Sequence, residues 1–138
     1  MLYVAVITPD RSVYAGDAES VSLPTAQGEI TVLPHHIPLI SVVAPGTLTI
    51  RKGGEETLVA VTRGVVEIDG RSLRVLVDTA DRAEELEEAA VLQAKQRAEN
   101  LLKERRHDAE GFAEATALLE REISKLQVVR RHRSRRRV

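Results

Sequence analysis

The chain has 138 residues, of which 43% are hydrophobic, and carries 20 basic residues against 21 acidic ones. This length allows one modest hydrophobic core and leaves no room for a second, independent catalytic domain. The absence of cysteine excludes disulfides and thiolate metal sites, which fits a reducing compartment.

The first half of the chain has the pattern of short β-strands joined by tight turns. Apolar residues alternate from residue 2 to 77, and Gln27-Gly28, Gly53-Gly54 and Asp69-Gly70 supply residues that tolerate positive φ in hairpins. The predicted strands are 2–7, 13–14, 20–24, 30–33, 39–43, 48–51, 57–62, 65–68 and 73–77. So many short strands favour a closed sandwich or flattened barrel.

Near Asp78 the hydrophobic period changes to three or four residues, which predicts helices for the second half. Asp81 is expected to cap the first helix, with Glu84 as its third residue. This helix should end near Arg106, and a turn at 107–111 should lead into a second helix that starts near Phe112. The pair is predicted to form an antiparallel hairpin.

Two apolar stripes should hold this hairpin together. They consist of Leu86, Ala90, Ala94, Ala98 and Leu101 in the first helix and Phe112, Ala115, Leu119, Ile123 and Leu126 in the second. A buried alanine contributes only a fraction of the roughly 1.5 to 3 kcal/mol of a buried leucine, so the contact is expected to be weak. Two interpretations follow, a mobile arm and a static two-helix cap over the sandwich.

The last nine residues contain six arginines, namely Arg130, Arg131, Arg133, Arg135, Arg136 and Arg137. Without them 14 basic residues remain against 21 acidic ones, a formal charge of −7. Such a tail is either a solvated terminus or a contact for nucleic acid, acidic lipid or an acidic protein surface. No apolar run reaches the length of a membrane span and no secretory signal pattern is present, so we expect a soluble, cytoplasmic protein.

Motifs for chemistry are missing from the sequence. It contains no phosphate-binding loop that ends in Lys-Ser or Lys-Thr and no Gly-x-Ser-x-Gly nucleophile elbow. His35 and His36 are adjacent, so in extended chain they point in opposite directions and cannot share a metal. One phenylalanine, two tyrosines and no tryptophan do not build a stacking platform for single strands. We therefore predict no catalytic residues, no metal site and no nucleic-acid partner.

The segment from Gln27 to Leu39, QGEITVLPHHIPL, resembles the GE-GI-LPGH-PL signature of the epsilon subunit of bacterial and chloroplast F-type ATP synthases. Pro45-Gly46, the run from Arg63 to Ile68 and the exit from Val75 to Ala80 are similar to further motifs of that family. The resemblance implies an α+β fold, with an N-terminal antiparallel β-sandwich of about ten strands followed by a two-helix hairpin. The implied parts are a sandwich at 1–80, a helical arm at 81–130 and a basic, flexible tail at 131–138.

The resemblance also implies a role. The sandwich would bind the gamma subunit and the polar loops of the c-ring in the central stalk of a proton-translocating ATP synthase, on the cytoplasmic face of the cell membrane. Glu29, in the Gly28-Glu29 turn, and His36 match the positions that face the c-ring, with 32–38 as the loop around them, and His35 replaces the usual glycine. The arm would either fold against the sandwich or extend toward the αβ hexamer, where it would inhibit ATP hydrolysis.

Some members of the family bind regulatory ATP through a segment written I/L-D-x-x-R-A. Here it reads Leu86-Glu87-Glu88-Ala89-Ala90-Val91, which lacks the arginine, while Arg97, Arg121 and Lys125 stand where basic partners would lie. The weak candidate contacts are thus Leu86, Glu87, Arg97, Arg121 and Lys125. Loss of the central guanidinium argues against tight ATP binding and against any required cofactor.

The arginine tail is expected to favour the extended, inhibitory arm, so that removal of residues 130–138 should raise ATP hydrolysis at low salt. Two alternatives from other classes are a regulatory adaptor unrelated to rotary enzymes and a nucleic-acid-associated protein that acts through the tail. Co-purification separates them, because gamma, an unrelated complex or salt-sensitive nucleic acid would accompany the chain.

Overall fold

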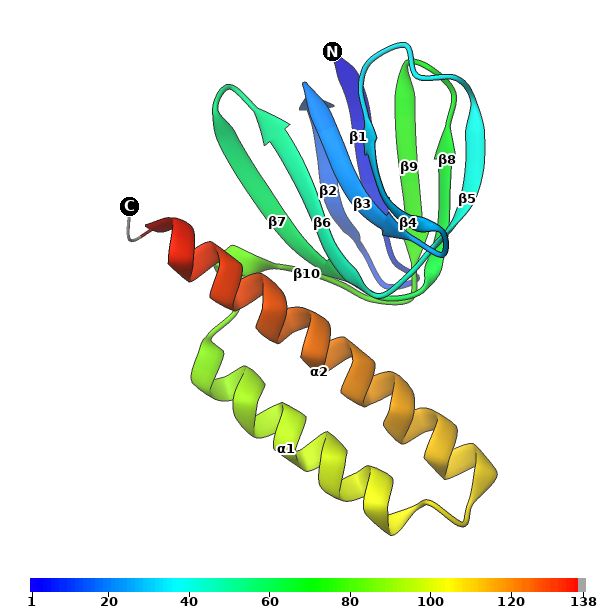
Figure 1. Ribbon diagram of the computed structural model, residues 1–138, viewed down its shortest axis with the longest axis vertical. Helices are drawn as coiled ribbons and strands as arrows, with labels where there is room; N and C mark the ends of the chain where they lie inside the picture. The colour runs from blue at the N-terminus through cyan, green and yellow to red at the C-terminus, as the bar shows by residue number, and fades with distance from the viewer. Residues whose placement is uncertain (137–138) are drawn as a thin grey trace.

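The computed structural model describes residues 1–136, which form a ten-stranded β body and a two-helix arm (Figure 1). The strands are β1 (Leu2–Ile7), β2 (Ser12–Ala18), β3 (Ser20–Thr25), β4 (Gly28–Val32), β5 (Leu39–Val43), β6 (Gly46–Lys52), β7 (Glu55–Val61), β8 (Gly64–Ile68), β9 (Ser72–Val77) and β10 (Ala80–Arg82). The helices are the 3₁₀ turn η1 (Ala83–Glu85), α1 (Glu88–Glu104) and α2 (Ala109–Arg136). The predicted α+β class, a β-sandwich followed by a helical hairpin, is confirmed.

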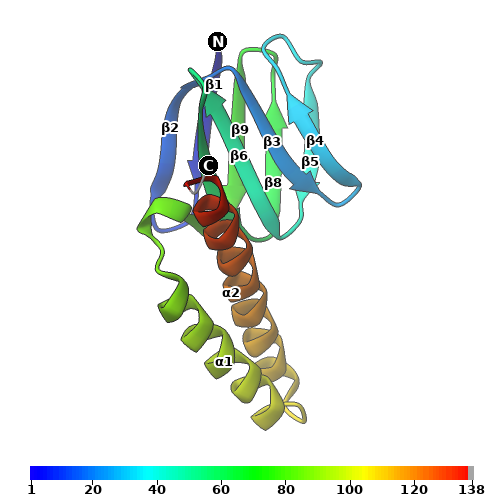
Figure 2. The same ribbon diagram turned by 60° about the vertical axis from the view of Figure 1, so that its left-hand side comes forward.

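The strands make one sheet that folds over on itself into two layers (Figure 2). Their order is β10-β7-β6-β3-β5-β8-β9-β1-β2, and β4 pairs with β3 off this path. The first and last strands of this order, β10 and β2, contact each other, so the two edges of the sheet meet. The pairing of β1 with β9 is parallel and the other pairings are antiparallel, so the predicted antiparallel sandwich holds with that one exception.

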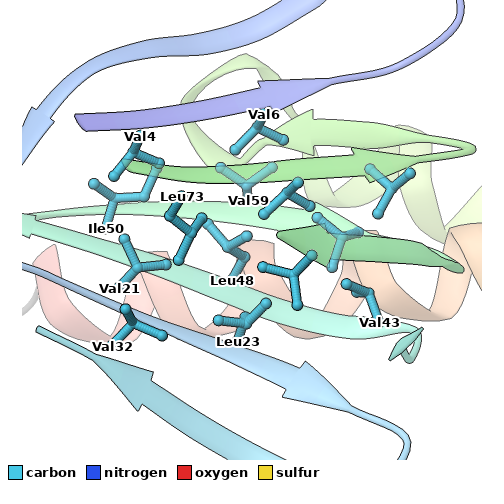
Figure 3. Close-up of a cluster of buried hydrophobic side chains, with 14 of the residues drawn as sticks. Val4, Val6, Val21, Leu23, Val32, Val43, Leu48, Ile50, Val59 and Leu73 are labelled. Atoms are coloured by element: carbon cyan, nitrogen blue, oxygen red, sulfur yellow. The ribbon is translucent and has the colours of Figure 1, made fainter. Parts of the chain in front are cut away.

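Branched and leucine side chains that alternate along the strands fill the space between the layers (Figure 3). The largest fully buried side chains are Leu2, Leu23, Leu48, Ile50 and Leu73. Each contributes roughly 1.5 to 3 kcal/mol relative to an exposed side chain. The buried residues of this core all lie between Leu2 and Ala80, so the β body has its own core without help from the helices.

Two predictions fail at the connection to the arm. Asp81 does not cap a helix; it lies in β10, a strand missing from the predicted set, where it pairs with Ala60 of β7. The first long helix begins at Glu88, and its N-cap residue Glu87 makes no side-chain cap hydrogen bond. The edge of β7 accepts β10 as a backbone partner, and this pairing carries the β body on to Arg82.

The helices form the predicted antiparallel hairpin, with a turn that ends earlier than expected. α1 stops at Glu104 and α2 already begins at Ala109. The stripes are partly wrong, because Val91 rather than Ala90 is buried in α1, while Phe112 and Ile123 of α2 are exposed. The reason is that α2 contacts two bodies, α1 on one side and the sandwich on another, so its buried residues do not form a single stripe.

The second face of α2 seats the arm on the sandwich. Val128 packs with Leu58 and Ala60 of β7 and with Ala83 of η1. The Ser124 hydroxyl donates a hydrogen bond to the Val61 carbonyl at 3.0 Å. α2 therefore lies between α1 and the β body in both views (Figures 1 and 2). It continues as helix through Arg136, so most of the expected basic tail is helical.

Candidate functional site

Four strongly exposed apolar side chains lie in or beside the loop from β4 to β5 and on β5 itself. Ile37 and Ile40 are 79% and 73% exposed, and Leu33 and Val42 are each 56% exposed. Isolated apolar residues on a surface are ordinary, but a contiguous group is typical of an interaction site. This group therefore marks a candidate docking surface.

Strand register extends this surface across the outside of the sandwich. Val42 of β5 is opposite Val65 of β8, Val65 is opposite Leu76 of β9, and Leu76 is opposite Ile7 of β1. Residues in register share a face of a sheet, and the neighbouring Val66 points to the core. We call Ile7, Val42, Val65 and Leu76 the apolar row.

A second row beside it is mixed in character. Ile40, Glu67, Arg74 and Ala5 are in register on the same face, and the Arg74 guanidinium lies 3.8 Å from the Glu67 carboxylate. A hollow of about 650 Å³ opens beside this row between Pro38 and Arg74. The face thus combines an apolar centre with a charged flank, which is the composition of a protein interface.

Two turns at the far end of the body from the arm hold the β4–β5 loop in place. His35 adopts φ 69°, the left-handed conformation for which the usual glycine is suited, and its N–H donates to the Gly70 carbonyl at 2.7 Å. In the facing turn the Asp69 carboxylate accepts the backbone N–H groups of Ser72 and Arg71, at 2.8 and 3.1 Å. These hydrogen bonds, with Ser72 the larger cause, lower the pKa of Asp69 below its ordinary value.

Glu29 and His36 do not come together. Glu29 is an exposed residue of β4 beside the β3–β4 turn, whereas His36 follows the opposite end of that strand and its Nδ1 lies 2.7 Å from the Ile37 carbonyl. At about 3.3 Å per residue, β4 separates them by more than 10 Å. A loop at 32–38 therefore contains His36 but not Glu29.

The candidate ATP contacts divide into residues that already have partners within the chain and residues that are exposed to solvent. Leu86 packs against the buried cluster of the hairpin, and Glu87 and Arg97 are exposed. Arg121 donates two hydrogen bonds to Asp81, and the Lys125 ammonium lies 3.2 Å from Glu122. The hydrogen bonds to Asp81 raise the pKa of Arg121 above its ordinary value. Both α2 cations are thus already neutralised by carboxylates of the same chain.

The basic end of α2 is engaged as well. Arg130 Nε donates to Glu88 Oε1 at 3.1 Å, and Arg133 donates to the other oxygen of the same carboxylate. Arg131 is exposed. The backbone at Arg135 and Arg136 is helical, and Arg137 lies outside the described residues.

Sequence reasoning missed the carboxylates Asp81, Glu88 and Glu122 as partners of these cations. A signal existed for Glu88, since an antiparallel hairpin places the acidic start of its first helix beside the basic end of its second. No such signal exists for Asp81, whose partner is 40 residues away.

In residues 1–136 no three His, Asp or Glu side chains gather into a potential metal site. No helix in that range has the length and apolar character needed to cross a membrane.

Comparison with known proteins gives a consistent result. The sequence model of the family described as ATP synthase, Delta/Epsilon chain, beta-sandwich domain, matches residues 1–83. The ATP synthase epsilon chain of Halalkalibacterium halodurans is 35% identical over 94% of this chain and 98% of its own length. That of Chromobacterium violaceum is 39% identical over 91% of each chain.

Among solved structures, a chain of the mitochondrial ATP synthase of Euglena gracilis, in an assembly of OSCP, F1 and c-ring, shares the fold. Its TM-score is 0.73 at 17% identity, with 89% of this chain and 78% of that chain covered. A chain from the central stalk and c-ring of the Tetrahymena thermophila mitochondrial ATP synthase gives a TM-score of 0.52 at 19% identity, and 61% and 68% of the two chains are covered.

Proposed function

The chain belongs to the family of ATP synthase epsilon chains, and we propose that its sandwich attaches it to the gamma subunit through the apolar row. As an epsilon chain it is a non-catalytic subunit of the ATP synthase. This membership does not favour the adaptor and nucleic-acid alternatives.

The exposure of the apolar row and of Ile40 beside it is the observation that carries this proposal. Val42 and Ile40 lie on the same side of β5 and expose more than half of each side chain to solvent. Such a face is stabilised when a partner covers it, because burial removes apolar area from water at about 25 cal/mol per Å². A rotor subunit that transmits torque needs a contact of this kind, which is apolar at its centre and charged at its flank.

The loop with His36 and the separate turn with Glu29 are proposed to face the polar loops of the c-ring. Since β4 holds the two residues apart, they would contact different places on the ring rather than one. Glu29→Ala with His36→Ala should lower proton-driven ATP synthesis in membranes, while gamma binding stays unchanged. Unaltered coupling in membranes with the double variant would count against both contacts.

The arm is proposed to have two states, folded on the sandwich as described above and extended toward the αβ hexamer, where it inhibits ATP hydrolysis. Small apolar contacts support this proposal: Val128 meets only Leu58, Ala60 and Ala83 in its cluster. States that differ by a few kcal/mol interconvert readily. We place the complex-bound chain on the cytoplasmic face of the cell membrane.

A pair of substitutions tests the docking face. Val42→Glu with Val65→Glu puts two carboxylates into the apolar row, and we expect the affinity for isolated gamma to fall by about thirtyfold or more. Leu92→Glu is the matched control, because Leu92 is an apolar residue of α1 that is 41% exposed and lies on the arm. Equal affinity of the double variant and the control would refute this face as the gamma site.

A further inference from the structure

A short connector joins the sandwich to the first long helix of the arm, and a carboxylate stands at each of its ends. Asp81 lies in β10, just before the connector, and Glu88 is the first residue of α1, just after it. Between them the chain passes through η1, and the two residues Leu86 and Glu87 are extended. Any movement of the arm relative to the sandwich has to change the backbone within these few residues.

The first carboxylate is held by the middle of α2. Arg121 Nε and Nη2 donate to the two oxygens of Asp81 at 3.2 and 3.1 Å, the paired geometry that gives guanidinium–carboxylate contacts their strength. Asp81 is only 8% exposed, so solvent screens this pair less than a surface pair. Arg121 thereby fixes α2 to the last strand of the sandwich.

The second carboxylate is held by the end of α2. Arg130 and Arg133 each donate a hydrogen bond to one oxygen of Glu88, so two guanidinium groups one helical turn apart bind a single carboxylate of α1. This contact closes the open end of the hairpin. It also neutralises part of a strongly basic helix end.

We propose that Arg121, Arg130 and Arg133 of α2 form a two-point lock on Asp81 and Glu88 that keeps the arm folded. The proposal rests on the proposed two-state arm and adds the residues that set its balance. The apolar support is small, since the hairpin cluster contains Val91, Leu126 and Val129 with Leu86 against it. The ion pairs therefore contribute strongly to how often the arm opens, and the exposed pair of Arg63, just before β8, with Glu120 of α2 adds to them.

The absence of cysteine makes the lock directly measurable. Spin labels on Gln27→Cys in the sandwich and Gln93→Cys in α1, both at exposed positions, report whether the arm is folded in the full chain. We expect Asp81→Asn to raise the ratio of open to folded molecules about tenfold and Glu88→Gln about threefold. Glu99→Gln is the matched control, since its partner Lys95 lies in the same helix and the pair does not bridge the connector.

Two further measurements keep the result unambiguous. High salt should open the unsubstituted chain to the level of Glu88→Gln at low salt, and should change Glu88→Gln itself much less. Reversal of the pair, with Glu88→Arg, Arg130→Glu and Arg133→Glu together, should restore the folded distance. If the lock variants match Glu99→Gln, or if the reversed pair does not restore folding of the arm, the lock is refuted.

The same variants separate the lock from the proposed function. Each should bind gamma as the unsubstituted chain does, because the apolar row is untouched. An arm that opens as expected without any change in ATP hydrolysis by the assembled enzyme would refute the inhibitory role and leave the lock intact.

Discussion

A single added methyl group at Gly64 should strongly destabilise the sheet that carries the docking face. A Cβ at this position would lie 1.9 Å from the Leu76 carbonyl oxygen and 2.7 Å from the Val77 Cα, both backbone atoms of β9. A flexible side chain could move aside, but these atoms cannot move unless β8 and β9 separate. Gly64→Ala therefore forces the loss of backbone hydrogen bonds between the two strands.

The cost follows from this geometry. Overpacking typically costs 1 to 3 kcal/mol, and each lost hydrogen bond adds about 1 kcal/mol, so we expect a loss of about 4 kcal/mol in the free energy of unfolding. For a chain of this size that lowers Tm by about 15 °C. Because Val65 follows directly in β8, binding to gamma should weaken in parallel.

Thermal unfolding followed by circular dichroism measures this effect. Gly16→Ala is the matched control, since its Cβ would meet the Tyr14 hydroxyl at 3.7 Å, an ordinary contact. Alanine is preferred over glycine within a strand by up to about 1 kcal/mol, so the Tm of this control should stay or rise slightly. An unchanged Tm for Gly64→Ala would refute the tight pairing of β8 with β9.

Three further outcomes are expected. Because carboxylates already neutralise Arg121 and Lys125, millimolar ATP should give no saturable heat in calorimetric titration of the full chain; tight binding would contradict this. A chain that ends at Arg133 keeps the hydrogen bonds to Glu88 and loses the last arginines, so the assembled enzyme should hydrolyse ATP faster at low salt. Equal rates of hydrolysis would show that the last arginines play no part in inhibition. Since the folded-state pKa of Asp69 is lowered, its stabilising effect is fully present above a pH of about 4 and is lost as the pH falls from there through the lower folded-state pKa, so Asp69→Ala should lower Tm at neutral pH and leave it unchanged in strong acid.

The sandwich was predictable because alternation and turn residues agree along most of its length. Strands at 2–7 and 39–43 were predicted with their observed ends, and Gly28, Gly53 and Gly70 adopt the positive φ expected of the turns. β10 was not predictable, since its three residues are Ala, Asp and Arg and show no apolar pattern. It forms because β7 offers an open edge for backbone hydrogen bonds.

The arm shows where local rules give way to tertiary contacts. Asp81 has the chemistry of a helix cap, but a bidentate contact with Arg121 replaces that role. Glu122 is buried in α2 beside Lys125, and in the described part of the chain its Oε2 has no hydrogen-bond partner. A buried carboxylate cannot be predicted from hydrophobic periodicity, because periodicity considers only the positions of apolar residues. Of the candidate site residues, His36 lies in the β4–β5 loop and its contact with the c-ring stays a prediction, whereas the apolar row emerges only from strand register.

Gamma binding by the sandwich alone tests the central claim most directly. The core lies within residues 2–80 and β10 ends at Arg82, so a chain ending at Ala83 retains the whole β body. We predict that this chain binds isolated gamma with the affinity of the full chain and that circular dichroism shows its strands intact. Loss of gamma binding while the sandwich remains folded would contradict the account.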